Sequence, residues 1–316
     1  LFISVLTFFM KYGWCRYAYK DYCIQLNTYR GKFIIKEMVG FTGWNLFAGL
    51  AMIGRNQGVA VIINIFLGTI ANAAYGVANQ INGALGHFSA TFQKAINPQL
   101  MKSEGMNDRN RLFRISFISS KFSVLALAFF AVPFIMEMNE VLTLWLKDDI
   151  PPFTLKLAQY ILLLSITYQY SVGIMAAIQA TGKIRNYQII MGSLLLMNVP
   201  IAYFILKMGY SVYYTTIAFV ILELISLCVR LFMANKLTGM SVKEYIQNVI
   251  QPTMIIIVIP VIVAMIPHFV MSNSFLKLVI VCSIYCLLFA VLMFRFAFDE
   301  GQREHIKSKI QHLLKR

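Results

Sequence analysis

Long apolar segments alternate with short polar connectors along almost the whole chain. A helix that crosses the hydrocarbon core of a bilayer, about 30 Å thick, needs roughly 20 mostly apolar residues. Segments of that kind recur, and the pattern predicts eight complete membrane-spanning helices. Their expected limits are residues 41–69, 74–97, 116–136, 155–181, 187–206, 212–234, 252–270 and 275–297.

Helix-ending or turn signals separate several of these segments. They are Asn97-Pro98, Pro151-Pro152, Thr181-Gly182 and residues 207–209. All connectors are short, which argues against an appended soluble domain. The longest of the connectors expected on the non-cytoplasmic side carries Glu137, Glu140, Asp148 and Asp149, which we interpret as a solvated acidic face.

Composition agrees with a bilayer as the solvent. Hydrophobic residues make up 59% of the chain and charged residues 13%, against roughly 45–50% and 25% in soluble domains. The chain begins with an apolar stretch at residues 1–10, which we expect to be the end of a truncated span. A basic, Tyr-rich loop is predicted at residues 11–36.

Lys and Arg gather on alternate connectors, as the positive-inside rule requires of cytoplasmic loops. The basic connectors are residues 11–36, 94–121, 183–185, 230–243 and the tail from 295, whereas the opposite connectors hold only Lys147, Lys156, Lys207 and Lys277. The carboxyl terminus is therefore expected in the cytoplasm. This asymmetry and anionic lipid headgroups account for the net charge of +15 without a nucleic-acid partner.

Arg55 lies near the middle of the first predicted span, followed by Asn56 and Gln57. A guanidinium at the centre of a bilayer costs at least about 2.5 kcal/mol, so such residues usually face a bundle interior or a wet cavity. Two interpretations are open for Arg55: a cavity residue, or a structural one bonded to carbonyls of a neighbouring helix.

Small and polar residues follow one stripe of the second predicted span at helical spacing. The stripe consists of Asn72, Gly76, Asn79, Gly83, Gly86, Ala90, Gln93 and Asn97, and the adjoining row of Gln80, His87 and Lys94. Such a face is either a close-packed seam of small residues or a hydrophilic wall that lines water. Lys94 is also placed to snorkel to the interface.

Glu223 is the carboxylate near the middle of a predicted span. A desolvated acid is suited to exchange a proton or a cation, and it is equally suited to pair with an Arg or a hydroxyl. We find no nucleophile elbow, phosphate loop, paired carboxylates or metal motif, so we predict no catalytic residue, no metal site and no cofactor apart from a coupling proton or sodium ion.

Five short motifs resemble, in order and spacing, the Wzx-type polysaccharide-lipid flippases of the MATE-like MOP superfamily. They are GWNLF at 43–47, RNQG at 55–58, AYGVANQI at 74–81, QKAINPQ at 93–99 and AIQATGK at 177–183. The resemblance implies an all-α integral membrane fold, a MATE-like transporter of fourteen helices built from two six-helix lobes and an additional helical pair. The eight predicted spans then correspond to its last eight helices, and residues 1–10 to the end of the one before.

On this template, residues 1–36 are the end of a truncated helix and a basic cytoplasmic loop, and residues 37–236 are the C-terminal six-helix transport lobe. Residues 237–298 are a cytoplasmic loop and the additional helix pair, and residues 299–316 are a basic cytoplasmic tail. The expected cavity residues are Arg55, Asn56, Gln57, Asn79, Gln80, His87, Gln93 and Lys94, with Glu223 as the ion-coupling residue. Much of the first lobe lies outside the sequence.

The resemblance implies export of undecaprenyl-pyrophosphate-linked oligosaccharide from the cytoplasmic to the periplasmic leaflet of a bacterial inner membrane, by alternating access, during polysaccharide (O-antigen or lipopolysaccharide) biosynthesis. Membrane lipids and other polysaccharide-assembly membrane proteins are further expected partners. The alternative within transport is a MATE-type antiporter of small cationic compounds. A membrane glycan polymerase or acyltransferase is a third interpretation, and the short loops argue against it.

Overall fold

The computed structural model describes residues 2–19, 32–147, 149–272, 274–298 and 303–304. It divides into two compact units, Leu1–Gly43 and Trp44–Arg316, which we treat separately. The regular elements in the described residues are all helices. Their bounds are α1 Phe2–Ala18, α2 Lys32–Gly105, α3 Arg109–Met136, α4 Met138–Leu146, α5 Thr154–Gln169, α6 Val172–Ala180, α7 Arg185–Leu196, α8 Asn198–Lys207, α9 Val212–Thr238, α10 Val242–Tyr245, the π-helix η1 Ile246–Ile250, α11 Gln251–Val270 and α12 Phe275–Phe296.

The first unit contains α1, which continues past the apolar stretch at residues 1–10 to Ala18. The predicted basic loop is thus partly helical at its beginning. Residues 20–31 of that loop lie outside the described residues, as do residues 299–302 and 305–316 of the predicted tail.

Six helices in the described part of the chain are long and apolar enough to cross a membrane. A seventh span results if α5 and α6, which meet at a bend of 40°, are taken together. The chain is therefore an all-α, multi-pass membrane protein. The predicted count of eight spans additionally requires the two parts of the very long α2 to cross separately.

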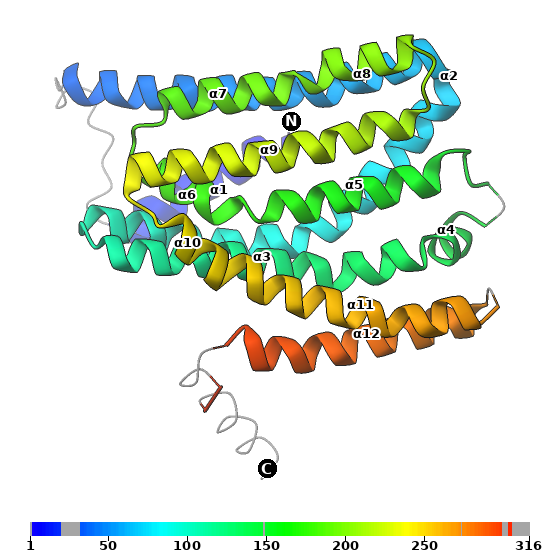
Figure 1. The fold of residues 1–316 in the computed structure, drawn as a ribbon. Helices are drawn as coiled ribbons and strands as arrows, with labels where there is room; N and C mark the ends of the chain where they lie inside the picture. Colours follow the sequence, from blue (N-terminus) through cyan, green and yellow to red (C-terminus); the bar gives the residue numbers. More distant parts are fainter. Residues whose placement is uncertain (1, 20–31, 148, 273, 299–302, 305–316) are drawn as a thin grey trace. The chain divides into compact units, whose positions relative to one another are not determined.

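Helix α2 changes direction at Gly68, whose φ of 77° and ψ of −176° are not helical. This backbone conformation is open to glycine because no Cβ opposes it. Figure 1 shows the chain turning back here. We call residues 44–67 the first arm and residues 69–105 the second arm. The second arm runs through Pro98 to Gly105, so the expected stop at Asn97-Pro98 is wrong.

The break between α5 and α6 falls at Tyr170 and Ser171, inside the predicted span 155–181. Backbone groups that the helix no longer bonds find side-chain partners there. The Tyr245 hydroxyl donates to the Tyr170 carbonyl, and the Gly173 N–H donates to the Ser120 hydroxyl at 3.0 Å. A non-helical turn at membrane depth is tolerated when its polar groups are satisfied within the protein.

Helix α3 is the most buried of the long apolar helices and packs against α5, α6, α11 and α12. Small residues permit close approach: a Cβ added to Gly173 would lie 2.0 Å from the Ser116 carbonyl oxygen. Ser116, Ser119, Ser120 and Ser123 are all buried on α3. Helices α11 and α12 pack mainly against each other and then against α3.

The connectors separate into two ends of the second unit. Figure 1 shows the turns α2–α3, α6–α7 and α9–α10 at one end, and the connectors α4–α5, α8–α9 and α11–α12 at the other. These three basic turns, which the sequence predicts as cytoplasmic, thus share one end. We call it the basic end, and the other the opposite end.

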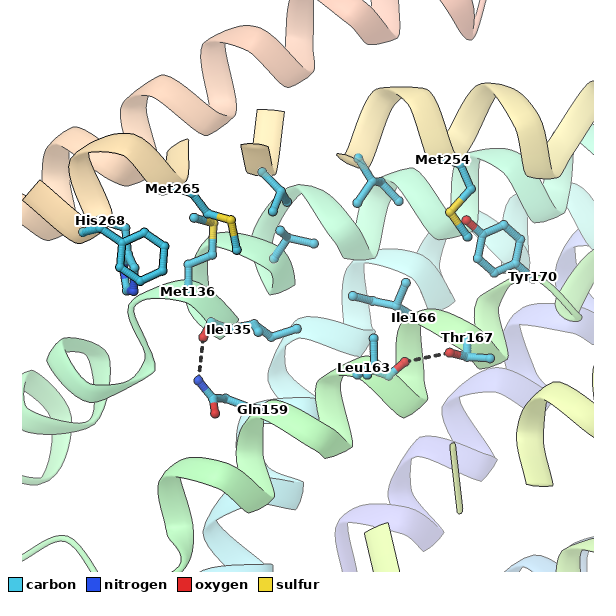
Figure 2. Close-up of a pocket in the computed structure, with 14 residues that line it drawn as sticks. Ile135, Met136, Gln159, Leu163, Ile166, Thr167, Tyr170, Met254, Met265 and His268 are labelled. Carbon is cyan, nitrogen blue, oxygen red and sulfur yellow. Dashed lines mark hydrogen bonds between the residues drawn. The ribbon is translucent and has the colours of Figure 1, made fainter. Parts of the chain in front are cut away.

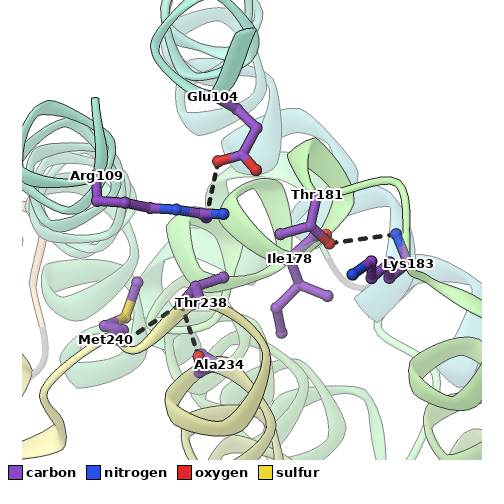
Figure 3. Close-up of polar contacts among 8 residues, drawn as sticks. All are labelled: Glu104, Arg109, Ile178, Thr181, Lys183, Ala234, Thr238 and Met240. Atoms are coloured by element: carbon purple, nitrogen blue, oxygen red, sulfur yellow. Dashed lines mark hydrogen bonds and ion pairs between the residues drawn. The ribbon is translucent and has the colours of Figure 1, made fainter. Parts of the chain in front are cut away.

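Local polar contacts close the turns at the basic end (Figure 3). Arg109 forms an ion pair with Glu104 at 2.8 Å across the α2–α3 turn. The Thr238 hydroxyl donates to the Ala234 carbonyl at 2.6 Å and accepts from the Met240 N–H at 3.3 Å, which shapes the α9–α10 turn. These contacts are local to each turn, so they fix where each helix ends.

The acidic connector at the opposite end is less solvated than the sequence predicts. Glu137 is completely buried where α3 ends and α4 begins. His268 and Lys277 reach it from the α11–α12 pair at 2.7 and 3.4 Å. The interpretation of Glu137 as part of a solvated face is therefore wrong, because partners distant in sequence remove it from water.

Candidate functional site

Arg55 lies on the face of the first arm that packs against the bundle. Val59, one turn further along the first arm, is completely buried, and Arg55 on the same face is partly buried. Its guanidinium lies over the ring of Phe219 on α9, 5.6 Å from the ring centroid, in cation–π geometry. The buried Arg55 Nε has no hydrogen-bond partner among the described residues.

Glu223 and Arg230 both lie on α9, the helix whose Phe219 contacts Arg55. They form a buried ion pair with each other. They are seven residues apart, which places them two turns apart on one helical face. The exposed fractions of these residues are only 9% and 6%. A carboxylate and a guanidinium this far from water neutralise each other's charge, which is how buried charges are tolerated.

The Arg230 guanidinium also fastens α9 to the break between α5 and α6. It donates to the Ser171 hydroxyl at 2.9 Å, and its centre lies 5.7 Å from the centroid of the Tyr168 ring. Tyr187, on α7, lies within the electrostatic reach of Arg230. One side chain of α9 thus contacts both sides of the point where the α5–α6 span is interrupted.

The guanidiniums of Arg55 and Arg230 both act electrostatically on one residue, Tyr168. The Tyr168 hydroxyl lies within the electrostatic reach of Arg230, Glu223 and Arg55 together. With both guanidiniums charged and the carboxylate ionised, two positive charges face one negative charge. We call Arg55, Tyr168, Ser171, Glu223 and Arg230 the guanidinium cluster. Its excess positive charge suits an anionic group.

The second arm of α2 forms a different polar surface. Gln93 and Ser89 donate to the same oxygen, Gln169 Oε1 on α5, at 3.0 and 2.7 Å. Asn82 accepts a hydrogen bond from Ser165, also on α5. Amide and hydroxyl contacts of this kind join helices in lipid. Gln93, predicted as a cavity residue, is therefore also a packing residue.

The rest of the predicted stripe is open. Asn79, Gln80, His87 and Lys94 are exposed, and the Asn79 amide donates to the Tyr75 carbonyl of its own helix at 2.8 Å. A Cβ added at Gly76, Gly83 or Gly86 would meet no atom within 4 Å. In this chain the stripe is therefore not a close-packed seam.

The structure brings together some of the predicted residues and separates others. Arg55 and Glu223 both lie within the electrostatic reach of Tyr168, whereas Asn56 and Gln57 on the first arm are exposed. Two groups of predicted residues result: Arg55 and Glu223, which belong to the guanidinium cluster, and an exposed amide-rich row on the second arm.

Arg230 is the residue that sequence reasoning missed. It was grouped with a cytoplasmic connector, but it lies inside α9 and is buried. A sequence signal exists, since Glu223 and Arg230 are spaced by one heptad within an otherwise apolar segment. The contributions of Ser171 and Tyr168 carry no such signal, because they depend on the α5–α6 break.

An apolar groove lies on another side of α5, away from these polar groups. It has a volume of about 490 Å³ and is lined by α3, α5 and α11. Figure 2 shows Met254 and Tyr170 toward one end and Met265 and His268 toward the other. Gln159 crosses between helices here and donates to the Ile135 carbonyl at 2.8 Å.

Comparison with protein-family models, with curated proteins and with solved structures finds no match to this chain.

Proposed function

We propose that this chain is the larger, C-terminal part of a transporter that moves undecaprenyl-pyrophosphate-linked oligosaccharide from the cytoplasmic to the periplasmic leaflet. The observation that carries the proposal is the Arg55 guanidinium. It is held inside an apolar bundle over Phe219, with an Nε that no described residue bonds. A buried donor without a partner is costly, so its retention favours a ligand that supplies the acceptor.

A pyrophosphate matches the Arg55 guanidinium in charge and in hydrogen-bonding groups. Its oxygens accept the paired N–H groups of a guanidinium, and such charge-assisted bonds strengthen where water is excluded. Arg230 compensates Glu223, which leaves the charge of Arg55 unopposed within the guanidinium cluster. A MATE-type antiporter of cations needs the opposite balance, an uncompensated carboxylate facing the path.

The exposed polar row on the second arm supports the oligosaccharide part of the proposed substrate. Exposed amides at Asn79 and Gln80, and the glycines on either side of them at 76, 83 and 86, leave hydrogen-bonding groups and room for sugar hydroxyls. Transport by alternating access then rocks this lobe against a partner lobe around the substrate, as in other transporters built from repeats. The interrupted α5–α6 span is a natural place for such bending.

The decisive experiment replaces Arg55 with Ala and with Lys in the complete protein and measures O-antigen or capsule export. The matched control is Arg185→Ala, because the Arg185 guanidinium also lies over an aromatic ring, that of Trp44 at 5.5 Å, but at an exposed position of the basic end. We expect Arg55→Ala to abolish export at unchanged membrane expression, Arg55→Lys to retain part of it, and Arg185→Ala to retain all of it. Normal surface glycan in Arg55→Ala cells would refute the proposal.

A further inference from the structure

A second buried ionic cluster lies far from the guanidinium cluster in sequence and has no part in the proposed transport site. Glu137, at the junction of α3 and α4, is completely buried. Its Oε1 lies 2.7 Å from His268 Nδ1 on α11, and its Oε2 lies 3.4 Å from Lys277 Nζ on α12. We call Glu137, His268 and Lys277 the opposite-end triad.

The triad ties the α11–α12 pair to the rest of the bundle. Each oxygen of the carboxylate meets one of the two helices, so a single residue holds both. Lys277 is itself buried, with 4% of its surface exposed. Such a pair depends on compensation, since a buried ammonium without a carboxylate partner is strongly destabilising.

Glu137 also determines which nitrogen of His268 carries the proton. A carboxylate is an acceptor, so the neutral imidazole bonds to it only as the Nδ1–H tautomer. The lone pair is then on Nε2. The His268 side chain is 27% exposed and lines the groove between α3, α5 and α11. A proton that enters the groove therefore meets the basic Nε2 of an imidazole ring that Glu137 orients through Nδ1.

We propose that the opposite-end triad is a proton-binding latch: a proton taken up at His268 Nε2 changes the charge of the triad from zero to +1 and loosens Lys277, and with it α12, from Glu137 at the junction of α3 and α4. The balance is simple, because neutral His268, ionised Glu137 and charged Lys277 sum to zero before uptake. Afterwards imidazolium and ammonium share one carboxylate and repel each other.

The elements packed around His268 carry other ionisable groups, but none of those named below is an imidazole. Glu140 lies one turn further along α4, and Cys282 on α12 lies within the electrostatic reach of Glu137. On α5, the Lys156 ammonium lies over the ring of Tyr213, and α11 carries no further ionisable residue. Imidazole is the side chain of this set that ordinarily changes charge between about pH 5 and 8.

The test follows the ring carbons of carbon-13-labelled histidine by NMR in the full chain, in lipid nanodiscs, across pH 5 to 8. The variant His268→Gln assigns the signal. We expect the Nδ1–H tautomer at pH 8 and imidazolium at pH 5.5. In Glu137→Gln we expect the preference for the Nδ1–H tautomer to be lost, because a neutral amide accepts from one tautomer and donates to the other. Lys277→Gln is expected to keep the tautomer but to lose the pH-dependent distance change described below, because no ammonium is left for imidazolium to repel. Lys156→Gln, which removes an exposed ammonium from the same end, is the control and is expected to change neither readout.

The mechanical part is read by spin labels at exposed Leu144 on α4 and Leu276 on α12. We expect a longer or broader distance distribution at pH 5.5 than at pH 8, and no difference between the two in His268→Gln. A histidine that does not titrate in this range, the Nε2–H tautomer, or an unchanged distance overturns the proposal. If Glu137→Gln fails to fold, Lys277→Gln and His268→Gln still decide it, since neither readout requires transport.

Discussion

Breaking the ion pair between Glu223 and Arg230 is expected to cost more than removing both of its members. Both side chains are nearly excluded from solvent, at 11% and 8% exposed. Loss of one member of a buried pair typically costs about 3–5 kcal/mol, because the remaining charge is left buried and uncompensated. We therefore expect Glu223→Ala to lower the free energy of unfolding by about 3 kcal/mol, the lower end of that range.

The lower end applies because Arg230 keeps other partners. It still donates to the Ser171 hydroxyl and lies over the Tyr168 ring after the carboxylate has gone. In the double variant Glu223→Ala with Arg230→Met, no charge remains and the thioether chain occupies much of the guanidinium's space. Its main loss is the hydrogen bond to Ser171, about 1 kcal/mol.

The assay is reversible unfolding of the full chain in mixed detergent micelles, followed by helical circular dichroism. The single variants Glu223→Ala and Arg230→Met and the double variant form a cycle, and we expect a coupling of about 2 kcal/mol. Glu244→Gln, a change at an exposed carboxylate, is the control and is expected to stay within about 0.5 kcal/mol of wild type. If the two single effects add to that of the double variant, the pair is not compensating a buried charge and the reasoning fails.

Two further predictions test how the helices pack around this cluster. Gly173→Ala places a methyl group 2.0 Å from the Ser116 carbonyl, so we expect a loss of about 3 kcal/mol in the same unfolding assay, whereas Gly83→Ala meets open space and is expected to retain or slightly raise stability. Tyr245→Phe removes the donor to the Tyr170 carbonyl at the α5–α6 break; we expect a loss of about 1–2 kcal/mol and faster hydrogen exchange at residues 169–173, and unchanged exchange there would contradict the role given to the hydroxyl.

Hydropathy was sufficient to predict the class and much of the helical framework. Helices α3, α9 and α12 fall on predicted spans because each is a long apolar segment with clear ends. The turn at Gly182 was predicted correctly, since φ is +71° there and glycine adopts that conformation readily. Pro98 misled the prediction. A proline within a helix removes one hydrogen bond, which the long second arm of α2 tolerates.

The details of the two ionic clusters could not be predicted in the same way. Glu223 was singled out from its own segment and its heptad spacing from Arg230 is visible in the sequence, but the contact of Arg230 with Ser171 depends on how the α5–α6 break packs beside α9. Glu137 was interpreted as solvated because its neighbours in sequence are polar, while His268 and Lys277 come from a helix pair that follows much later. The local sequence pattern predicts which charged residues lie in apolar segments, and tertiary packing decides which partners neutralise their charges.

The ion pair also constrains the hypothesis that Glu223 couples an ion. Arg230 donates to one oxygen of the carboxylate, Glu223 Oε1, so a proton or a sodium ion that takes this oxygen must replace the guanidinium. Arg230 is joined to the α5–α6 break through Ser171, so its movement and the bending of that span are linked. Coupling at Oε1 therefore requires an exchange in which the incoming ion replaces Arg230 while the guanidinium takes another acceptor. A pyrophosphate held near Arg55 would provide that acceptor, and ion and substrate would then act on one cluster through a single moving side chain.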